Sequence, residues 1–241
     1  MKKITSAALL ALKLSWKAAL LTFLLAAGVQ TFDMYRELMP GGVPLQTTFG
    51  FETLLRTAAE PAGKIWFVVL LAALILSAGS SKGSRSVYTL NRLGLTEVRV
   101  TLVSGLVFSG YFLLYWAMQL ALAYGYFVWY CRLGLVSSNA FMLSCWRSEW
   151  LHTLLPLGEW LGYLRNAFVC LSFGFNAAIG VHRRRHGKNA LFSFAPAVLC
   201  ALLLVGQPGE SWQHIGLMVL LTAITAVWLC AIKGGDEDEI L

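Results

Sequence analysis

Long apolar stretches alternate with short polar connections along almost the whole chain. Six of them approach the roughly 20 residues that a helix needs to cross a bilayer core about 30 Å thick. These stretches are Trp16–Phe32, Ile65–Ser80, Val100–Tyr130, Leu161–Val181, Ala190–Gly206 and Ile215–Ile232. The pattern predicts an all-α polytopic membrane protein with six transmembrane helices in a single domain, residues 1–241. Arg165 falls near the start of the fourth stretch, where a long side chain can extend to the lipid headgroups.

Basic residues gather in alternate connections, which orients the predicted spans. One set of connections carries Lys2, Lys3, Lys13, Lys17, Lys82, Arg85, Arg92, Arg99, Arg183, Arg184, Arg185, Lys188 and Lys233. The other set has fewer basic residues, and they are mixed with acidic ones. Lysine and arginine favour the cytoplasmic side of a membrane. We therefore expect both the N-terminus and the C-terminus in the cytoplasm.

The first residues resemble a secretory signal, because two lysines precede an apolar stretch. Lys13 and Lys17 interrupt that stretch, however, and leave an unusually long basic leader. A short amphipathic helix over residues 1–15, lying on the inner membrane surface and leading into a retained first span, fits this pattern better.

The segment between the third and fourth spans, residues 132–160, is longer than a turn requires. It carries Trp146, Trp150 and Trp160, and tryptophan prefers the boundary between membrane and water. We expect one or two short helices at the outer interface. Anchoring in the interface and gating of a substrate are both open roles for this segment.

Small residues four positions apart lie inside two of the predicted spans. Gly105 is followed by Ser109, and Gly174 is followed by Ala178. Such pairs let helix backbones approach closely. They predict close packing within this chain or against a partner subunit.

Composition and charge narrow the function classes. Hydrophobic residues make up 58% and charged residues 13%, with a mean hydropathy of +0.67, whereas soluble domains are about 25% charged. The net charge of +7 comes from residues beside the apolar stretches. It therefore indicates orientation and contact with membrane lipid, and we expect no nucleic-acid partner.

Few residue patterns indicate catalysis or metal binding. The chain has no GxxxxGK[ST] loop, so it cannot hydrolyse ATP by that route, and it has no HExxH. His182 and His186 have the spacing of two ligands on one helix face. They bracket Arg183, Arg184 and Arg185, whose charges would repel a cation. We therefore predict a basic stop signal there, with no metal and no cofactor.

Glu149 and His152 are three residues apart and could share a helix face on the outer side as an acid–base site. The polar face of an interfacial helix explains them better, so no catalytic residue is assigned and the chain is not predicted to be an enzyme. The five cysteines include no CxxC. Cys131 and Cys145 both fall on the outer side of the predicted topology, so a disulfide between them stays open, although no pattern in the sequence supports it.

The connection between the second and third spans has the pattern of an amphipathic helix. At about 100° per residue, Val87, Leu90 and Leu93 share one arc, while Arg85 and Arg92 share the opposite edge. Such a helix either rests on lipid headgroups or inserts its apolar side into a groove of a cytoplasmic protein. The pattern alone does not separate these alternatives.

The layout resembles the permease subunits of ABC exporters that move drugs, peptides and polysaccharides. These have six spans, a surface helix before the first, and a coupling helix between spans two and three. Gly83-Ser84 and the stretch Tyr88–Leu93 are similar to that family's loop. Gly94 stands where proline is usual, and Lys82 replaces a common acidic residue. Residues 146–156 also resemble uncharacterised permeases encoded by Gram-positive gut bacteria.

The resemblance implies a plasma-membrane permease subunit, working as an exporter with a second permease subunit, identical or related. A separate cytoplasmic ATP-binding-cassette ATPase would contact Arg85, Val87, Tyr88, Leu90, Arg92 and Leu93. Two alternatives stay open. One is the substrate-capturing subunit of a vitamin importer, which works without such a coupling helix. The other is an integral membrane enzyme acting at the outer surface through Glu149 and His152.

Overall fold

The computed structural model describes residues 2–39, 50–79, 94–133, 141–203 and 211–238. Within these ranges every regular element is a helix and there is no strand. The helices are α1 (Lys2–Leu38), α2 (Phe51–Leu54), η2 (Leu55–Ala59), α3 (Glu60–Gly79), α5 (Glu97–Arg132), α6 (Phe141–Arg147), α7 (Glu149–Leu154), α8 (Trp160–Arg185), η4 (Leu191–Phe194), α9 (Ala195–Leu203) and α10 (Ser211–Asp238). The prediction of an all-α fold is confirmed.

Five helices are long and apolar enough to cross a membrane. They are α1, the continuous run from α2 through α3, α5, α8 and the Trp212–Ile232 part of α10. The predicted fifth span, Ala190–Gly206, corresponds to η4 and α9, and its apolar helix Leu191–Cys200 is shorter than a crossing requires. Residues 204–206 of that span lie outside the described part of the chain. The long apolar helices indicate a membrane protein.

Residues 2–15 form the first part of α1, with no break before the predicted first span. Ser15 ties this part of α1 to the bundle, because its hydroxyl donates to the Tyr111 hydroxyl of α5 at 3.3 Å. The expected surface helix is thus continuous with the span that follows.

A wide turn precedes α3. Pro61 has no N–H to bond back to Thr57, and just before it the Glu60 N–H reaches the Leu55 carbonyl. This five-residue spacing makes η2 a π-helical turn. The helix therefore begins at Phe51, well before the predicted start of the second span at Ile65.

Gly187 ends α8 in a left-handed conformation, with φ of 73°. The Lys188 N–H bonds to the Arg183 carbonyl at 2.8 Å, and the Gly187 N–H bonds to the Arg184 carbonyl at 3.1 Å. This paired arrangement satisfies carbonyls that a helix C-terminus otherwise leaves open. It fixes the direction in which the chain leaves α8.

Small residues bring α5 and α8 into backbone contact. A Cβ on Gly174 would overlap the backbone of Ser109, and a Cβ on Gly105 would overlap the ring of Phe175. The Ser109 hydroxyl also donates to the Leu171 carbonyl across the interface at 3.3 Å. The close packing predicted from the small residues is confirmed, and it occurs within this chain.

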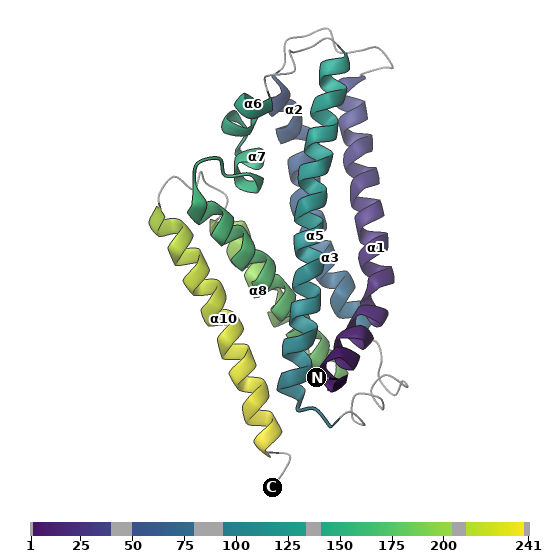
Figure 1. Cartoon of the computed structure of the whole chain (residues 1–241), viewed down its shortest axis with the longest axis vertical. Coiled ribbons are helices and arrows are strands. Elements are labelled where there is room, and N and C mark those ends of the chain that lie inside the picture. Colours follow the sequence, from purple (N-terminus) through teal and green to yellow (C-terminus); the bar gives the residue numbers. More distant parts are fainter. Residues whose placement is uncertain (1, 40–49, 80–93, 134–140, 204–210, 239–241) are drawn as a thin grey trace.

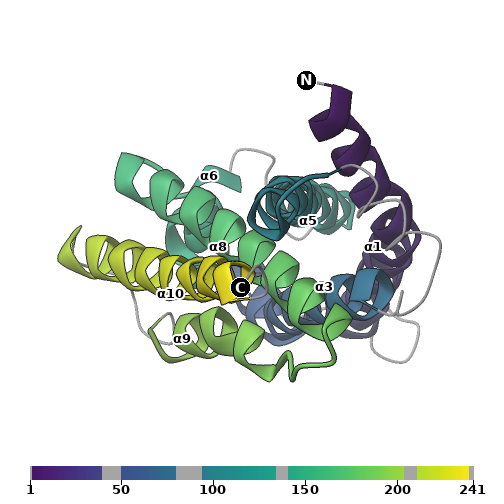
Figure 2. The ribbon, with the colours of Figure 1, turned by 90° about the horizontal axis from the view of Figure 1, so that it is seen from below.

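The helices run lengthwise and create two distinct ends (Figures 1 and 2). The start of α1, the end of α3, the start of α5 and the ends of α8 and α10 lie together at what we call the basic end. The end of α1, the end of α5, the short helices α2, α6 and α7, and the starts of α8 and α10 form the opposite end, the α7 end. Buried apolar side chains form one cluster in the middle of the bundle and a second at the α7 end.

Candidate ligand pocket

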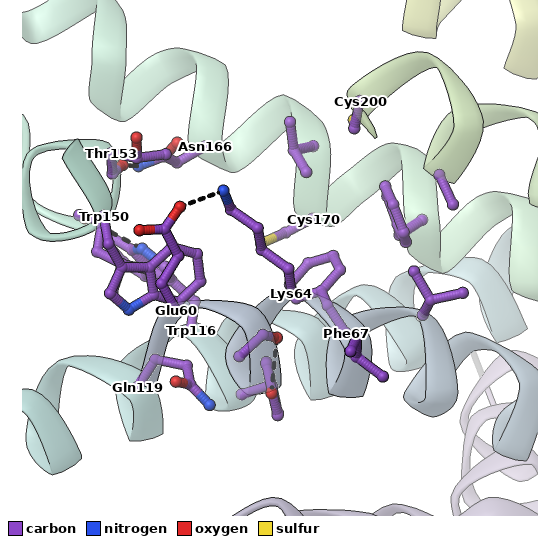
Figure 3. A pocket seen from close by; sticks show the side chains of 18 of the residues that line it. Glu60, Lys64, Phe67, Trp116, Gln119, Trp150, Thr153, Asn166, Cys170 and Cys200 are labelled. Atoms are coloured by element: carbon purple, nitrogen blue, oxygen red, sulfur yellow. Dashed lines mark hydrogen bonds and ion pairs between the residues drawn. The ribbon is translucent and has the colours of Figure 1, made fainter. Parts of the chain in front are cut away.

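A pocket of about 400 Å³ lies among five helices of the bundle (Figure 3). This volume is within the range of cavities that hold small organic molecules. Its walls are formed by Glu60, Gly63, Lys64, Ile65, Phe67 and Val68 of α3, Tyr115, Trp116 and Gln119 of α5, Glu149, Trp150, Thr153 and Leu154 of α7, Asn166, Val169, Cys170 and Phe173 of α8, and Ala197 and Cys200 of α9.

Most of the wall is apolar, and its aromatic part is rigidly packed. The Phe67 ring lies 4.8 Å from the Phe173 ring and 5.6 Å from the Tyr115 ring, centre to centre, both edge to face. Interlocked rings lose little freedom when a ligand binds, so the wall is preorganised. The chemistry of this region favours the apolar body of a ligand.

The polar groups of the pocket come chiefly from α3, α7 and the start of α8. Lys64 forms an ion pair with Glu60 one turn earlier, and its ammonium lies 5.9 Å from the centre of the Trp150 ring (Figure 3). Glu149 and Asn166 contribute further polar side chains to the lining. A pocket with polar groups beside an apolar wall is suited to an amphipathic ligand.

Gly63 allows the Trp150 indole to pack closely against α3. A Cβ at this position would lie 2.6 Å from Cζ2 of Trp150, so a larger residue would displace the indole. The carbonyl of Gly63 accepts a hydrogen bond from the Tyr115 hydroxyl at 3.0 Å. On the other side, Nε1 of Trp116 donates to the Leu154 carbonyl at 3.1 Å. These contacts hold α7 against α3 and α5.

Gln119 joins the pocket to α1. Its Oε1 accepts a hydrogen bond from Nε2 of Gln30 at 3.0 Å. Its own Nε2 is buried and has no hydrogen-bond partner among the described residues. A buried donor without an acceptor is costly, so a ligand acceptor placed there would be favoured.

Arg165 lies beside the pocket and organises its α7 side. Its guanidinium donates to the Thr153 carbonyl at 3.1 Å and to Oδ1 of Asn166 at 3.0 Å, and lies 3.3 Å from Nδ1 of His214. Only 2% of Arg165 is exposed. The expectation that it extends to the headgroups is wrong, because protein acceptors from α7 and α10 satisfy the guanidinium inside the bundle.

Glu159 lies between two histidines, His152 and His214, of which His214 also contacts Arg165. One of its carboxylate oxygens lies 3.8 Å from Nε2 of His152, and the other lies 3.7 Å from Nε2 of His214. The predicted alternative of an acid–base pair had joined Glu149 to His152. In the structure Glu149 lines the pocket, and His152 lies near Glu159.

The predicted ATPase-contacting residues cannot be placed. Residues 85–93, with Arg85, Val87, Tyr88, Leu90, Arg92 and Leu93, lie outside the described part of the chain. The segment 132–160 does contain two short helices, α6 and α7, as expected. Cys131 and Cys145 are free thiols, and burial raises the pKa of the Cys145 thiol.

Sequence reasoning missed the pocket, because its lining residues are spread over more than half of the chain. Nothing in their spacing indicates that Glu60, Gln119 and Asn166 converge. In comparisons with known proteins, no family model, no curated protein and no solved structure matched this chain. The pocket and the helix pattern are therefore the basis for a functional proposal.

Proposed function

We propose that the chain is the membrane-spanning permease subunit of an ATP-driven transporter of the ABC class, working as an exporter in the plasma membrane. The observation that carries the proposal is the pocket of about 400 Å³ among helices that are apolar enough to cross a membrane. Such a cavity can hold a small amphipathic cargo part-way across the bilayer. The cargo itself would contact the aromatic wall and the polar groups of α3 and α7.

Six crossings are part of the proposal. Helices α8 and α10 run in the same direction, each from the α7 end to the basic end (Figure 1). The chain between them must therefore return along the length of the bundle. η4 starts near Gly180 at the basic end and α9 reaches the pocket with Ala197 and Cys200, which supports this segment as the fifth of six crossings.

The basic end would face the cytoplasm. It holds Arg99 and the run from Arg183 to Lys188 among the described residues, and α3 ends and α5 starts there. The segment 80–93 joins these two helices. The predicted coupling helix would thus be presented at the cytoplasmic side, where an ATPase subunit can dock.

Apolar faces of α1 and α10 remain uncovered within this chain. Leu20, Leu24 and Phe32 of α1 and Val219 and Val227 of α10 are largely exposed. Lipid would cover such faces in a membrane, and a second permease subunit, identical or related, would cover part of them in the transporter.

The decisive experiment is co-purification of the ATPase with a matched pair of variants. Leu90→Asp would bury a charge in an apolar groove at a cost of several kcal/mol, and each 1.4 kcal/mol corresponds to about tenfold in affinity. We expect the ATPase to be lost from the purified complex while the permease still inserts. Arg92→Ala, at the rim of the same contact, should weaken docking far less and in a salt-dependent way.

An unchanged set of partners for Leu90→Asp would contradict the coupling assignment and leave a helix that rests on lipid. A second candidate is the substrate-capturing subunit of a vitamin importer, because a pocket of about 400 Å³ is large enough to hold a small organic molecule. That candidate predicts tight binding of a small molecule by the isolated chain and no dependence of its partners on Leu90.

A further inference from the structure

Three potential metal ligands meet at the basic end. Glu97 from the first turn of α5 and His182 and His186 from the end of α8 place their ligand atoms within 4.8 Å of one another. Oε2 of Glu97 lies 3.3 Å from Nδ1 of His182, and the two imidazole centres are 4.5 Å apart. Two imidazoles and one carboxylate are a ligand set that Zn²⁺ and similar divalent cations prefer.

One of the three ligand pairs already has the separation that a tetrahedral cation requires. Metal bonds of about 2.0–2.1 Å to nitrogen and oxygen place neighbouring ligand atoms about 3.3 Å apart around a tetrahedron. The contact between Glu97 and His182 already has this separation. His186 is exposed and caps the end of α8, so its side chain has room to turn toward the other two.

The three neighbouring arginines had argued against a metal in the sequence. In the structure Arg183 turns to α10, where its guanidinium carbon lies 4.8 Å from the centre of the Trp228 ring, and its Nε donates to the Asn189 carbonyl at 2.7 Å. The stem of Arg184 packs on Gly79 of α3. Of the three, Arg185 is the one that acts electrostatically on Glu97.

The C-terminal end of α8 also favours the binding of a cation electrostatically. The C-terminal end of a helix carries partial negative charge and stabilises cations near it. His182 and His186 occupy the last turn of α8, and Glu97 supplies a full negative charge from α5. Together these groups offset the remaining positive charge of Arg185.

We propose that Glu97, His182 and His186 bind one divalent transition-metal cation of the Zn²⁺ class, with water in the fourth position, and that this cation ties the start of α5 to the end of α8. The site lies at the opposite end of the bundle from Glu149 and His152. It is independent of the transport proposal, because it needs neither cargo nor ATPase.

The test is Zn²⁺ binding to the full chain, purified in detergent without a polyhistidine tag and stripped with chelator. Bound metal is counted by elemental analysis, and affinity is measured by competition with a chromophoric chelator. We expect one Zn²⁺ per chain. His186→Ala should weaken binding at least about 100-fold, since even residues that only orient a ligand contribute about 10–100-fold. Its exposed side chain makes it the variant least able to disturb folding.

Glu97→Gln and His182→Ala should lose the metal in the same way, and Co²⁺ in the wild type should give the intense visible absorption of a tetrahedral ion. His152→Ala is the matched control, because it removes a histidine near a glutamate at the α7 end; its binding should be unchanged. A wild-type chain that takes up no Zn²⁺ at micromolar concentration, or a His186→Ala variant that binds as the wild type does, would overturn the proposal.

Discussion

The two ends of the bundle use the same residue types in different ways. At the α7 end, Glu159 faces two histidines beside Arg165. At the basic end, Glu97 faces His182 and lies near His186 beside a run of arginines. The difference is in what holds the arginine. Arg165 is buried and bonded to a backbone carbonyl and an asparagine. At the basic end Arg183 packs against α10 and Arg184 against α3, and Arg185 is the arginine that acts electrostatically on Glu97.

This contrast teaches that residue identity alone does not separate a structural network from a ligand site. At the α7 end the Arg165 guanidinium lies among its acceptors and uses its N–H groups in hydrogen bonds with them. Where Arg183 and Arg184 pack on other helices, the ligand atoms of Glu97, His182 and His186 lie within 4.8 Å of one another, close enough to converge on a cation. The α7 end is therefore built to hold α7, α8 and α10 together, and the basic end is built to accept an ion.

The largest expected difference between the ends is in access from outside the cell. In a variant whose five native cysteines are replaced by alanine, cysteine introduced at Arg147 should react with a membrane-impermeant maleimide added to intact cells. Cysteine introduced at Lys188 should react only after the membrane is opened. Both positions are exposed in the structure, so reaction of the Lys188→Cys variant in intact cells would refute the proposed orientation.

The second-largest expected effect is the loss of stability when the hydrogen bonds of Arg165 at the α7 end are removed. Arg165→Met removes the hydrogen bonds to Thr153 and Asn166 and leaves buried acceptors less satisfied, which should cost about 3 kcal/mol of stability. Thermal unfolding of the purified protein should show a clearly lowered Tm. Arg165→Lys keeps the charge but not the planar fork, so it should recover only part of the loss. A wild-type Tm in Arg165→Met would show that the network is not structural.

The smallest effect is expected at the basic end in the absence of metal. His182→Ala removes a partly exposed contact with Glu97, and such contacts contribute about 1 kcal/mol or less. Its Tm without metal should thus stay close to that of the wild type. Adding Zn²⁺ should raise the Tm of the wild type and leave that of the variant unchanged. A large loss of stability in metal-free His182→Ala would show that the basic end, like the α7 end, is a structural network, and it would contradict the comparison.

Apolar runs and small residues predicted most of the fold. Long apolar runs gave the five long helices within a few turns, and Gly105 and Gly174 marked the contact between α5 and α8. Boundaries were less predictable. The second long helix begins at Phe51 because the π-helical turn before Pro61 keeps the chain helical, whereas the apolar pattern had started this span at Ile65.

The candidate sites depended on contacts that no local pattern encodes. Glu97 and His182 are 85 positions apart, so the histidine pair could be noticed in the sequence but its carboxylate partner could not. Arg165 looked like a residue for the membrane surface because its partners, Thr153 and His214, come from other helices. Tertiary packing supplied both the missing ligand and the missing acceptors.

The length of α5 has a consequence for where the proposed metal site lies. Its 36 residues extend about 54 Å at 1.5 Å per residue, and a tilt of 40° would still leave a vertical span of about 41 Å. The hydrocarbon layer is only about 30 Å thick, so α5 must project beyond it. Glu97 is the first residue of α5. If the proposed orientation holds, this charged end extends past the hydrocarbon layer, where a hydrated ion can arrive without crossing lipid.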